Sequence, residues 1–335
     1  MMKISTPPLY AFFLILPIII LLSLAVGFRP SEIGSDTINY IKYYNAIGLF
    51  YFEAPFEFLF NLVATLFFSF DCPVGVFFTC LSVINFIIIG FISNRITYYI
   101  GYRIFWVLMI FLNLSPFFLN VQTNVIRQGT ATLSLLLFYI LLLTRSKSLN
   151  LILVALLATG FHKSTIIFIL CSILTLFSYQ TVFRSVFFLA ALYTSNIMTR
   201  IIFLVSKYLP VDLYGIISSY GRNTGYKIGN RLDFVIFTFT AGAFFYYMSK
   251  YFLNSIDREK FLQLVKIYWI LTIPFFLLGF GAYADRYLLP AWLYLSILSA
   301  VLLVLAFRRD FPTKTVYSSL LLSSVLFCFL VQGIF

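Results

Sequence analysis

The stretch Asn124–Leu143, NVIRQGTATLSLLLFYILLL, places an arginine and an amide at the start of a long apolar run. About 20 predominantly apolar residues are enough for a helix to cross a bilayer. Arg127 at this position has two explanations. Its charged end lies at the membrane surface while its stem follows the apolar chain, or it faces a partner, because an arginine at the centre of a membrane helix costs about 2.5–3.5 kcal/mol.

Similar apolar runs recur along the whole chain. Of its 335 residues, 62% are hydrophobic and only 10% are charged, a composition that no soluble domain can bury. The sequence therefore predicts an all-α, polytopic integral membrane protein that forms a single membrane domain over residues 1–335. The twelve expected apolar segments lie at about residues 9–28, 55–70, 73–93, 104–119, 127–144, 149–161, 165–178, 183–205, 232–249, 263–283, 287–307 and 315–335.

Two of these segments leave the number of crossings at about eleven or twelve. Residues 9–28 end in Gly-Phe-Arg-Pro rather than in a small-residue cleavage site, so we expect an uncleaved first span and not a signal peptide. Segment 55–70 is short and is entered through Glu53, Pro55 and Glu57, which favours a re-entrant or interfacial helix. The alternative is an external N-terminus with twelve full crossings.

Basic connectors account for the net charge of +12, and nucleic acid is not indicated. Short loops rich in Lys and Arg face the cytoplasm in membrane proteins. The basic connectors are residues 94–103, 144–148, Arg184, residues 250–260 and residues 307–314. From residue 95 onward, alternation then places Asn124–Gln128, His162, the long connector 206–231 and residues 284–287 together on the external face. The loop of residues 29–54, with an amphipathic helix, is also expected to be external.

The cysteine and histidine content argues against a metal site. Four cysteines show no CxxC pairing and lie mostly inside apolar runs, so neither a metal nor a disulfide is indicated. His162 is the only histidine of the chain, which argues against a zinc or di-iron site built from clustered histidines.

The first external loop contains a stripe of tyrosines. In RPSEIGSDTINYIKYY, residues 29–44, the side chains of Asp36, Tyr40 and Tyr44 are four residues apart and share one face of an amphipathic helix. Ser35 or Asp36 could simply cap this helix. The tyrosine rings suit stacking on a sugar or a place in the interfacial aromatic belt.

Amide side chains gather around Arg127, and Pro116 can break the preceding helix. An arginine among amides at the mouth of a helix suits a multiply charged oxygen ligand. The alternative is the surface position described above. The amides are Asn120, Gln122, Asn124 and Gln128.

The lone histidine lies in TGFHKST, residues 159–165, between two apolar segments. A lone histidine is commonly a structural residue. Here His162, Lys163 and Ser164 are expected at a helix start, where backbone N–H groups favour an anion. Histidine is also the side chain that changes protonation near neutral pH.

The connector 206–231 repeats tyrosine every six residues among glycines and basic residues. Aromatic rings beside cations suit an extended anionic or carbohydrate chain, and disorder is the alternative. Further along, Asp285 and Arg286 start another span, where they could simply pair with each other. Taken together, the polar groups on this face indicate the handling of a phosphate or diphosphate at the membrane boundary.

The order of these motifs resembles a known family. SDTINYIKYY, NVIRQGTA, FHKST, a Tyr- and Gly-rich loop and DRYLLP look like the EpsG-type branch of bacterial O-antigen polymerases, the Wzy-like proteins. The resemblance spans roughly residues 29–290, and IRQG and FHKS are its most specific elements.

Members of that family lengthen surface polysaccharides by moving a growing glycan from one undecaprenyl-diphosphate carrier onto another carrier-linked repeat unit. The resemblance implies a polytopic, lipid-carrier-dependent glycosyltransferase of the bacterial inner membrane, without a metal or another cofactor. Its active site is then expected to face the periplasm or the outside. The implied partners are the undecaprenyl-diphosphate-linked oligosaccharide, the lipid bilayer and a chain-length regulator protein.

The resemblance also implies residue roles. Arg127 contacts the donor diphosphate and Gln128 orients it. His162 is the general base for the acceptor hydroxyl or a further phosphate contact, and Arg286 neutralises the leaving diphosphate. Asp36 with Tyr40 positions the acceptor sugar, and the Asp36 carboxylate is the alternative base. The remaining substrate-binding candidates are Asn124, Lys163, Tyr220, Arg222, Arg231 and Asp285.

Three other classes compete with a polymerase. A flippase for lipid-linked oligosaccharide would share the ligand, but it needs polar residues along a path through the bilayer, and the span centres here are nearly bare. An O-antigen ligase would use similar groups on another acceptor. A membrane acyltransferase would need a stronger acid–base pair than one histidine beside a serine.

Overall fold

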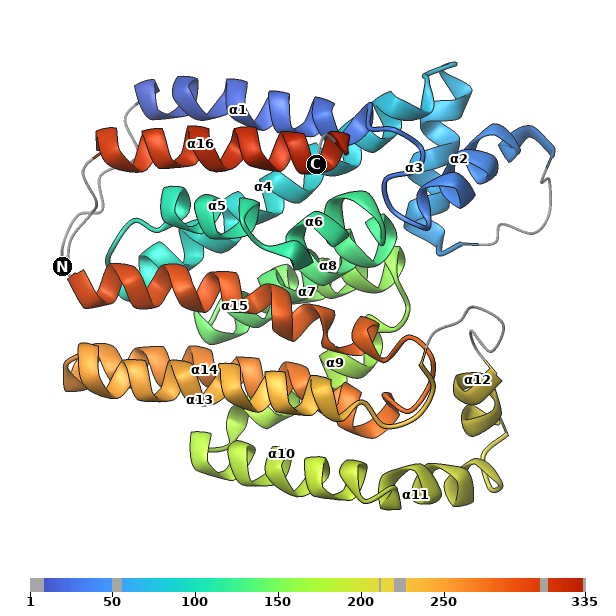
Figure 1. The fold of residues 1–335 in the computed structure, drawn as a ribbon, viewed down its shortest axis with the longest axis vertical. Coiled ribbons are helices and arrows are strands. Elements are labelled where there is room, and N and C mark those ends of the chain that lie inside the picture. Colours follow the sequence, from blue (N-terminus) through green and yellow to red (C-terminus); the bar gives the residue numbers. More distant parts are fainter. Residues whose placement is uncertain (1–8, 50–55, 211, 220–226, 308–312, 334–335) are drawn as a thin grey trace. The chain divides into compact units, whose positions relative to one another are not determined.

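The computed structural model describes residues 9–49, 56–210, 212–219, 227–307 and 313–333 (Figure 1). Within these ranges the chain forms sixteen α-helices and two short 3₁₀ helices, and no strand. The predicted all-α, polytopic membrane class is therefore confirmed. The chain divides into two compact units, Met1–Thr165 with Ser299–Phe335 (unit 1) and Ile166–Leu298 (unit 2). The single membrane domain over 1–335 stays a prediction.

Unit 1 is built from long helices and several short ones. In it α1 packs on α4 and α16, α7 packs on α4, α6 and α8, and α3 packs on α8. Figure 1 shows α1 and α16 side by side. The helices are α1 (Leu9–Gly27), α2 (Thr37–Asn45), η1 (Ile47–Leu49), α3 (Phe58–Ser69), α4 (Val74–Ile100), α5 (Phe105–Asn113), α6 (Pro116–Thr123), α7 (Ile126–Leu143), α8 (Ser148–Phe161) and α16 (Thr313–Gln332).

Unit 2 is centred on α14, against which α10, α11 and α13 pack. Two helices, α9 and α15, cross between the units along the chain. The connector 206–231 is not a continuous loop, because it contains the short helix α12. The helices are α9 (Thr165–Cys171), η2 (Ser172–Leu176), α10 (Tyr179–Thr194), α11 (Ile197–Ser206), α12 (Leu213–Ser219), α13 (Leu232–Phe252), α14 (Ser255–Leu278) and α15 (Ala284–Phe307).

Each of the twelve predicted apolar segments corresponds to a helix or a pair of helices in the described ranges. Six helices are long and apolar enough to cross a membrane, or eight spans if each of two bent pairs counts as one. Four further apolar helices are shorter. The bent pairs are α5 with α6, at 80°, and α10 with α11, at 84°.

The first bend has a clear sequence cause. Pro116 occupies the first position of α6, and Ser115 caps that helix by accepting a hydrogen bond from the Phe118 N–H. Proline is favoured at this position but cannot continue a preceding helix. The prediction that Pro116 breaks the preceding helix is confirmed: α5 ends at Asn113, α6 occupies Pro116–Thr123, and α7 begins at Ile126.

Helix α3 bears out the short segment expected at 55–70. It has 12 residues, which at 1.5 Å per residue is about 18 Å and less than the thickness of a bilayer core. Helix α8 lies beside it, and Gly160 permits the approach, because a Cβ at Gly160 would be only 2.5 Å from Leu59 Cδ1.

The loop between α1 and α2 is fixed to the end of α6. Arg29 is buried and donates hydrogen bonds to the carbonyl oxygens of Val26 and Thr123, at 2.7 and 2.8 Å. Gly34 has a positive φ of 86°, and a Cβ there would be 2.5 Å from the Thr123 oxygen. These contacts hold the loop against the chain just before α7, and so they fix where α7 begins.

Candidate functional site

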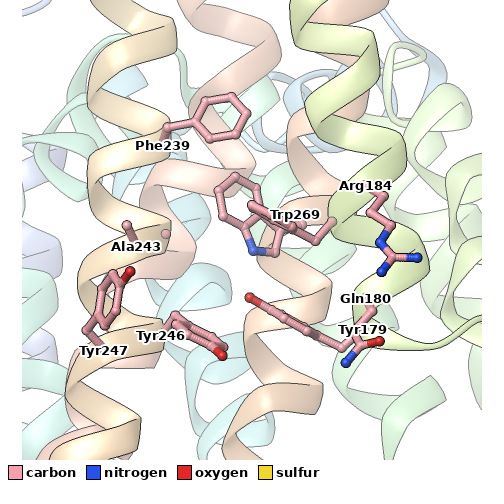
Figure 2. Close-up of a pocket in the computed structure, with 10 residues that line it drawn as sticks. Tyr179, Gln180, Arg184, Phe239, Ala243, Tyr246, Tyr247 and Trp269 are labelled. Atoms are coloured by element: carbon pink, nitrogen blue, oxygen red, sulfur yellow. The ribbon is translucent and has the colours of Figure 1, made fainter.

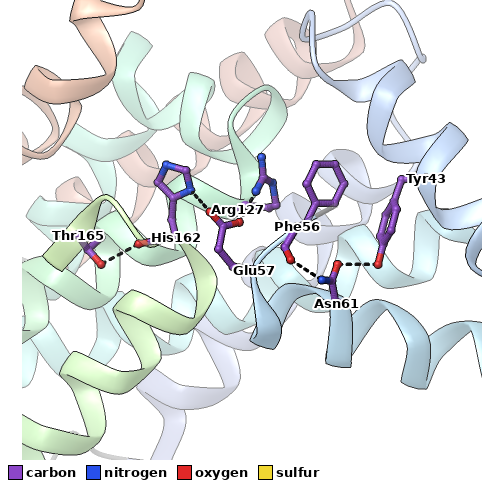
Figure 3. A network of polar contacts seen from close by, with 7 residues as sticks. All are labelled: Tyr43, Phe56, Glu57, Asn61, Arg127, His162 and Thr165. Carbon is purple, nitrogen blue, oxygen red and sulfur yellow. Dashed lines mark hydrogen bonds and ion pairs between the residues drawn. The ribbon is translucent and has the colours of Figure 1, made fainter. Parts of the chain in front are cut away.

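Three ionisable side chains of unit 1 meet at one carboxylate (Figure 3). Glu57 pairs through Oε2 with Nη1 of Arg127. Its other oxygen, Oε1, lies 2.8 Å from Nδ1 of His162. The three side chains are mostly buried, with exposed fractions of 11% for Glu57, 18% for Arg127 and 20% for His162. We call this set the Glu57 cluster.

Glu57 stands at the N-cap of α3, with an extended backbone at ψ 154°. A helix N-terminus favours a negative charge, although the Glu57 side chain makes no capping hydrogen bond. Burial by itself raises the pKa of Glu57, but the contact with His162 and the positive charge of Arg127 outweigh it and lower the pKa to about 2. Glu57 is therefore ionised at neutral pH and cannot serve as the proton-transferring base there.

Arg127 lies in the first turn of α7 and its guanidinium is stacked on aromatic rings. Its Cζ is 4.0 Å from the ring centre of Phe56 and 5.8 Å from those of Tyr40 and Phe60. Such stacking fixes the plane of the guanidinium. The Nε atom is buried and makes no hydrogen bond. Arg127 thus binds Glu57 through Nη1, while Nε of the same guanidinium donates no hydrogen bond.

A small polar brace supports Phe56. Asn61 donates a hydrogen bond to the Phe56 carbonyl and accepts one, at 2.7 Å, from the Tyr43 hydroxyl. Tyr43 packs edge-on against the Phe56 ring, with centroids 4.7 Å apart. The brace ties α2 to the residue that immediately precedes Glu57 (Figure 3).

His162 differs from its predicted position. We expected it at a helix start, but it is the C-cap of α8, with an extended backbone at φ −158°. Its carbonyl accepts hydrogen bonds from the Thr165 N–H and hydroxyl, at 3.1 and 2.8 Å. Helix α9 begins at Thr165, directly after Ser164, so a helix start does follow His162, and the anion site expected there stays a prediction. A helix C-terminus instead favours a cation, such as a protonated imidazole.

The first predicted group has a structural role. Helix α2 is confirmed, but the rings of Tyr40 and Tyr44 are only 4% and 3% exposed and pack among Phe56, Phe60 and Phe77, so neither offers a face to a sugar. The capping interpretation of Asp36 holds for its position in the chain but not for its side chain. Asp36 is the N-cap of α2 without a side-chain cap hydrogen bond.

Asn124, the C-cap of α6, accepts hydrogen bonds from the residues at the start of α2. Its Oδ1 accepts hydrogen bonds from the Ser35 hydroxyl, at 3.0 Å, and from the Asp36 N–H, at 2.9 Å. The Gln128 side chain is buried on α7, and Lys163 is exposed beside His162. The substrate contacts expected of these three residues stay predictions.

The other predicted residues belong to unit 2. Arg231 pairs with Asp233, with Nε–Oδ1 at 2.9 Å, and its Cζ lies 3.6 Å from the centre of the Phe234 ring. Asp285 is close enough to feel the charges of both Arg286 and Arg231, and Arg286 stacks at 4.2 Å on Tyr283. Unit 2 therefore brings its own predicted cations together. Tyr220 and Arg222 lie outside the described residues.

Sequence reasoning missed Glu57 as a site residue. We interpreted it as a polar marker at the edge of a short apolar segment, and it is separated from Arg127 by 70 residues. One signal was available. The chain has 11 acidic residues against 23 Lys and Arg, so a carboxylate next to an apolar helix is an expected partner for a cation in the same environment.

An apolar groove adjoins the Glu57 cluster between α3 and α8. It has a volume of about 480 Å³, and it begins at the residue after Glu57 and ends two residues before His162. Thr159 is its only side chain with a hydroxyl. It is lined by Phe58, Leu59, Leu153, Leu156, Leu157, Thr159 and Gly160.

Comparisons with known proteins identify the family of the chain. No curated protein and no solved structure matches the chain. The sequence profile of the EpsG family matches residues 12–332. Because this match covers nearly the whole chain, the protein belongs to the EpsG family, which suggests a polysaccharide polymerase-type membrane protein.

Proposed function

We propose that this protein is a polysaccharide polymerase. It transfers a growing glycan from an undecaprenyl-diphosphate carrier onto a carrier-linked repeat unit, at the external face of the bacterial cytoplasmic membrane. Family membership supports the class of protein. The observation that carries the reaction is that Arg127 and His162 converge on the Glu57 carboxylate beside an apolar groove.

Arg127 provides the charge that a leaving diphosphate needs. Planar guanidinium groups bind phosphate oxygens through two parallel hydrogen bonds. Glu57 occupies Nη1, while the buried Nε has no hydrogen bond, so a phosphate oxygen has a preorganised donor to accept from. Stabilisation of developing charge by a fixed donor is typically worth about 10²–10³ in rate.

His162 is the general base. Its Nδ1 faces Glu57, which fixes the ring and leaves Nε2 to accept a proton from the acceptor hydroxyl. The hydroxyl oxygen forms the new glycosidic bond at the anomeric carbon, the bond from that carbon to the diphosphate breaks, and the electron pair leaves with the diphosphate. The proton passes to His162, and the ionised Glu57 stabilises the resulting imidazolium. This favours His162 over Asp36 as the base.

The groove between α3 and α8 suits the apolar part of a carrier lipid. Its lining is almost wholly aliphatic and aromatic, and the Glu57 cluster lies next to it. A lipid diphosphate needs this combination, with charged donors for the diphosphate and an apolar surface for the chain. Gln128 and Arg286 are proposed as further diphosphate contacts and Asp36 as an acceptor contact, and a chain-length regulator as a partner.

Chain extension in vesicles tests the proposal. Purified protein in lipid vesicles receives the undecaprenyl-diphosphate repeat unit of its host, and the products are separated by length. Wild type is expected to give a ladder of longer lipid-linked glycans. Arg127→Ala should slow extension about 10²–10³-fold, and His162→Ala about 10²–10⁴-fold.

The matched control is Arg145→Ala, because Arg145 is exposed just beyond the opposite end of α7. It should extend glycans like wild type. Movement of the repeat unit between leaflets without a ladder would instead identify a flippase. Transfer to a different acceptor without chain growth would identify a ligase.

A further inference from the structure

A second groove lies within unit 2. Helices α10 and α13 both pack on α14 and leave a cavity of about 480 Å³, with Trp269 of α14 among its walls (Figure 2). Eight of its lining side chains are labelled in Figure 2. The lining residues are Tyr179, Gln180, Phe183, Arg184, Phe239, Gly242, Ala243, Tyr246, Tyr247 and Trp269.

The apolar walls of this groove are formed by aromatic rings packed on Trp269. A Cβ at Gly242 would be 2.2 Å from the indole of Trp269, so only glycine lets α13 approach the ring. Phe183 and Phe239 each lie 5.2 Å from Trp269, centroid to centroid. Aromatic packing of this kind is rigid, and it keeps the groove open as a preformed surface.

Polar groups also line this groove. The indole N–H of Trp269 is buried beside the Tyr179 hydroxyl, without a well-aligned hydrogen bond to it. In the part of the chain that the structure describes, Arg184 and Gln180 make no hydrogen bond or ion pair, and both are exposed. A buried donor without an acceptor indicates a ligand oxygen.

The surroundings indicate a lipid with a negative headgroup. Helix α13 is a candidate membrane span with only 22% of its apolar window buried, which leaves an apolar surface that a lipid can cover. Two further cations lie close to the groove along the chain: Arg258 stacks at 5.6 Å on the lining residue Tyr246, and Lys250 lies in the last turn of α13. Clusters of Lys and Arg at a membrane surface attract anionic lipids.

We propose that this groove binds one anionic glycerophospholipid of the surrounding bilayer. An acyl chain lies along Phe183, Phe239 and Trp269, an ester oxygen accepts from the indole N–H, and the phosphate meets Arg184 with Gln180. The site is independent of the Glu57 cluster and of the proposed polymerase reaction. Inorganic phosphate alone does not match it, because most of the lining is apolar.

Tryptophan fluorescence with brominated lipids tests the site. The chain has 3 Trp, so Trp106→Phe with Trp292→Phe leaves Trp269 as the only tryptophan. In nanodiscs, brominated phosphatidylglycerol should quench Trp269 at lower mole fraction than brominated phosphatidylcholine, by about fivefold for one cation. Native mass spectrometry of the wild-type protein should show one retained phosphatidylglycerol after delipidation.

Two variants with matched controls decide the outcome. Arg184→Gln should remove the preference for phosphatidylglycerol, and Ala243→Phe should fill the groove and abolish the retained lipid. Arg200→Gln and Ala191→Phe, at exposed positions on α11 and α10, should change neither readout. Equal quenching by both lipids, or a retained lipid that survives Ala243→Phe, overturns the proposal and leaves only ordinary annular lipid.

Discussion

Arg29 and Arg127 are both arginines of unit 1 that lie against aromatic rings, but their donors are used in different ways. Arg29 is 7% exposed and is held by neutral oxygens, the carbonyls of Val26 and Thr123 and the hydroxyl of Thr37. Burial lowers the pKa of Arg29 to about 10, which still leaves it charged at neutral pH. It connects the loop after α1 to the end of α6.

Arg127 is held by one carboxylate and three rings, and its buried Nε has no acceptor. The comparison shows that burial alone does not mark a functional arginine. A guanidinium whose donors all end on neutral oxygens of the protein stabilises the fold. One that shares a carboxylate with a histidine and keeps a donor unused is arranged for a ligand.

Removing the charge of Glu57 should have the largest effect. Glu57→Gln keeps the shape of the side chain, but the amide no longer fixes His162 or stabilises its protonated form. Loss of such an orienting carboxylate costs about 10³–10⁴ in rate in comparable sites. We expect chain extension to fall by about 10³-fold, with the loss mainly in kcat.

This variant also distinguishes a structural role of Glu57 from a role in the reaction. If Glu57 only held α3 in place, Glu57→Gln would lower the amount of folded protein and leave the turnover of the folded fraction unchanged. Size-exclusion chromatography in detergent measures that fraction alongside the extension assay. Unchanged turnover per folded molecule would remove Glu57 from the mechanism.

Arg29→Met should show the opposite pattern. The methionine fills the space beside Phe78 but removes the donor of the Val26 carbonyl oxygen, while the Thr123 oxygen keeps only the hydrogen bond from the Thr37 hydroxyl. A buried unsatisfied group costs about 1–3 kcal/mol, so the free energy of unfolding should fall by about 2 kcal/mol. Thermal unfolding in detergent measures the loss, and the turnover of the folded fraction should change little. A large loss of turnover at full stability would contradict the division between the two arginines.

Acid should weaken the Glu57 cluster more than the rest of the fold. The pKa of Glu57 is about 2 in the folded protein against an ordinary 4.5, so its contribution to stability is complete above pH 4.5 and is lost as the pH falls towards 2. At pH 3 the free energy of unfolding of wild type should be about 2 kcal/mol lower than at neutral pH through this group, a loss that Glu57→Gln does not show. Unfolding temperatures of both proteins between pH 7 and pH 3 test this, and parallel curves would show that the pair does not stabilise the fold.

Much of the fold could be predicted from apolar runs, because a bilayer demands them. The span at α7 and the break at Pro116 follow from local sequence. The bend between α10 and α11 does not. The two helices together are apolar enough for one span, and the bend between them lies at Asn196, whose φ of 60° is in the left-handed region. Asparagine adopts the left-handed region more readily than most residues, but it also occurs in ordinary helices and loops, so its presence alone does not predict a bend.

The sequence predicted Arg127 and His162 as members of the candidate site, but not the Glu57 carboxylate. Arg127 and His162 stand out because a charge or a histidine is rare in this chain. Glu57 reaches them only through tertiary packing, since α3 must lie against α8 before the N-cap residue of α3 meets the C-cap of α8. Tyr40 was misjudged for the same reason, because its neighbours Phe56 and Phe60 come from another segment.

The smallest expected effect tests the geometry of the guanidinium rather than its charge. Arg127→Lys keeps a cation beside Glu57, but an ammonium group cannot stack flat on Phe56 or present a second donor in a fixed plane. Extension should fall about tenfold while the unfolding temperature stays close to that of wild type. The matched variant Arg29→Lys should do the reverse, because a lysine cannot reach the oxygens on both sides of the loop. If Arg127→Lys extended glycans like wild type, charge alone would suffice and the unused Nε donor would have no part in binding the diphosphate.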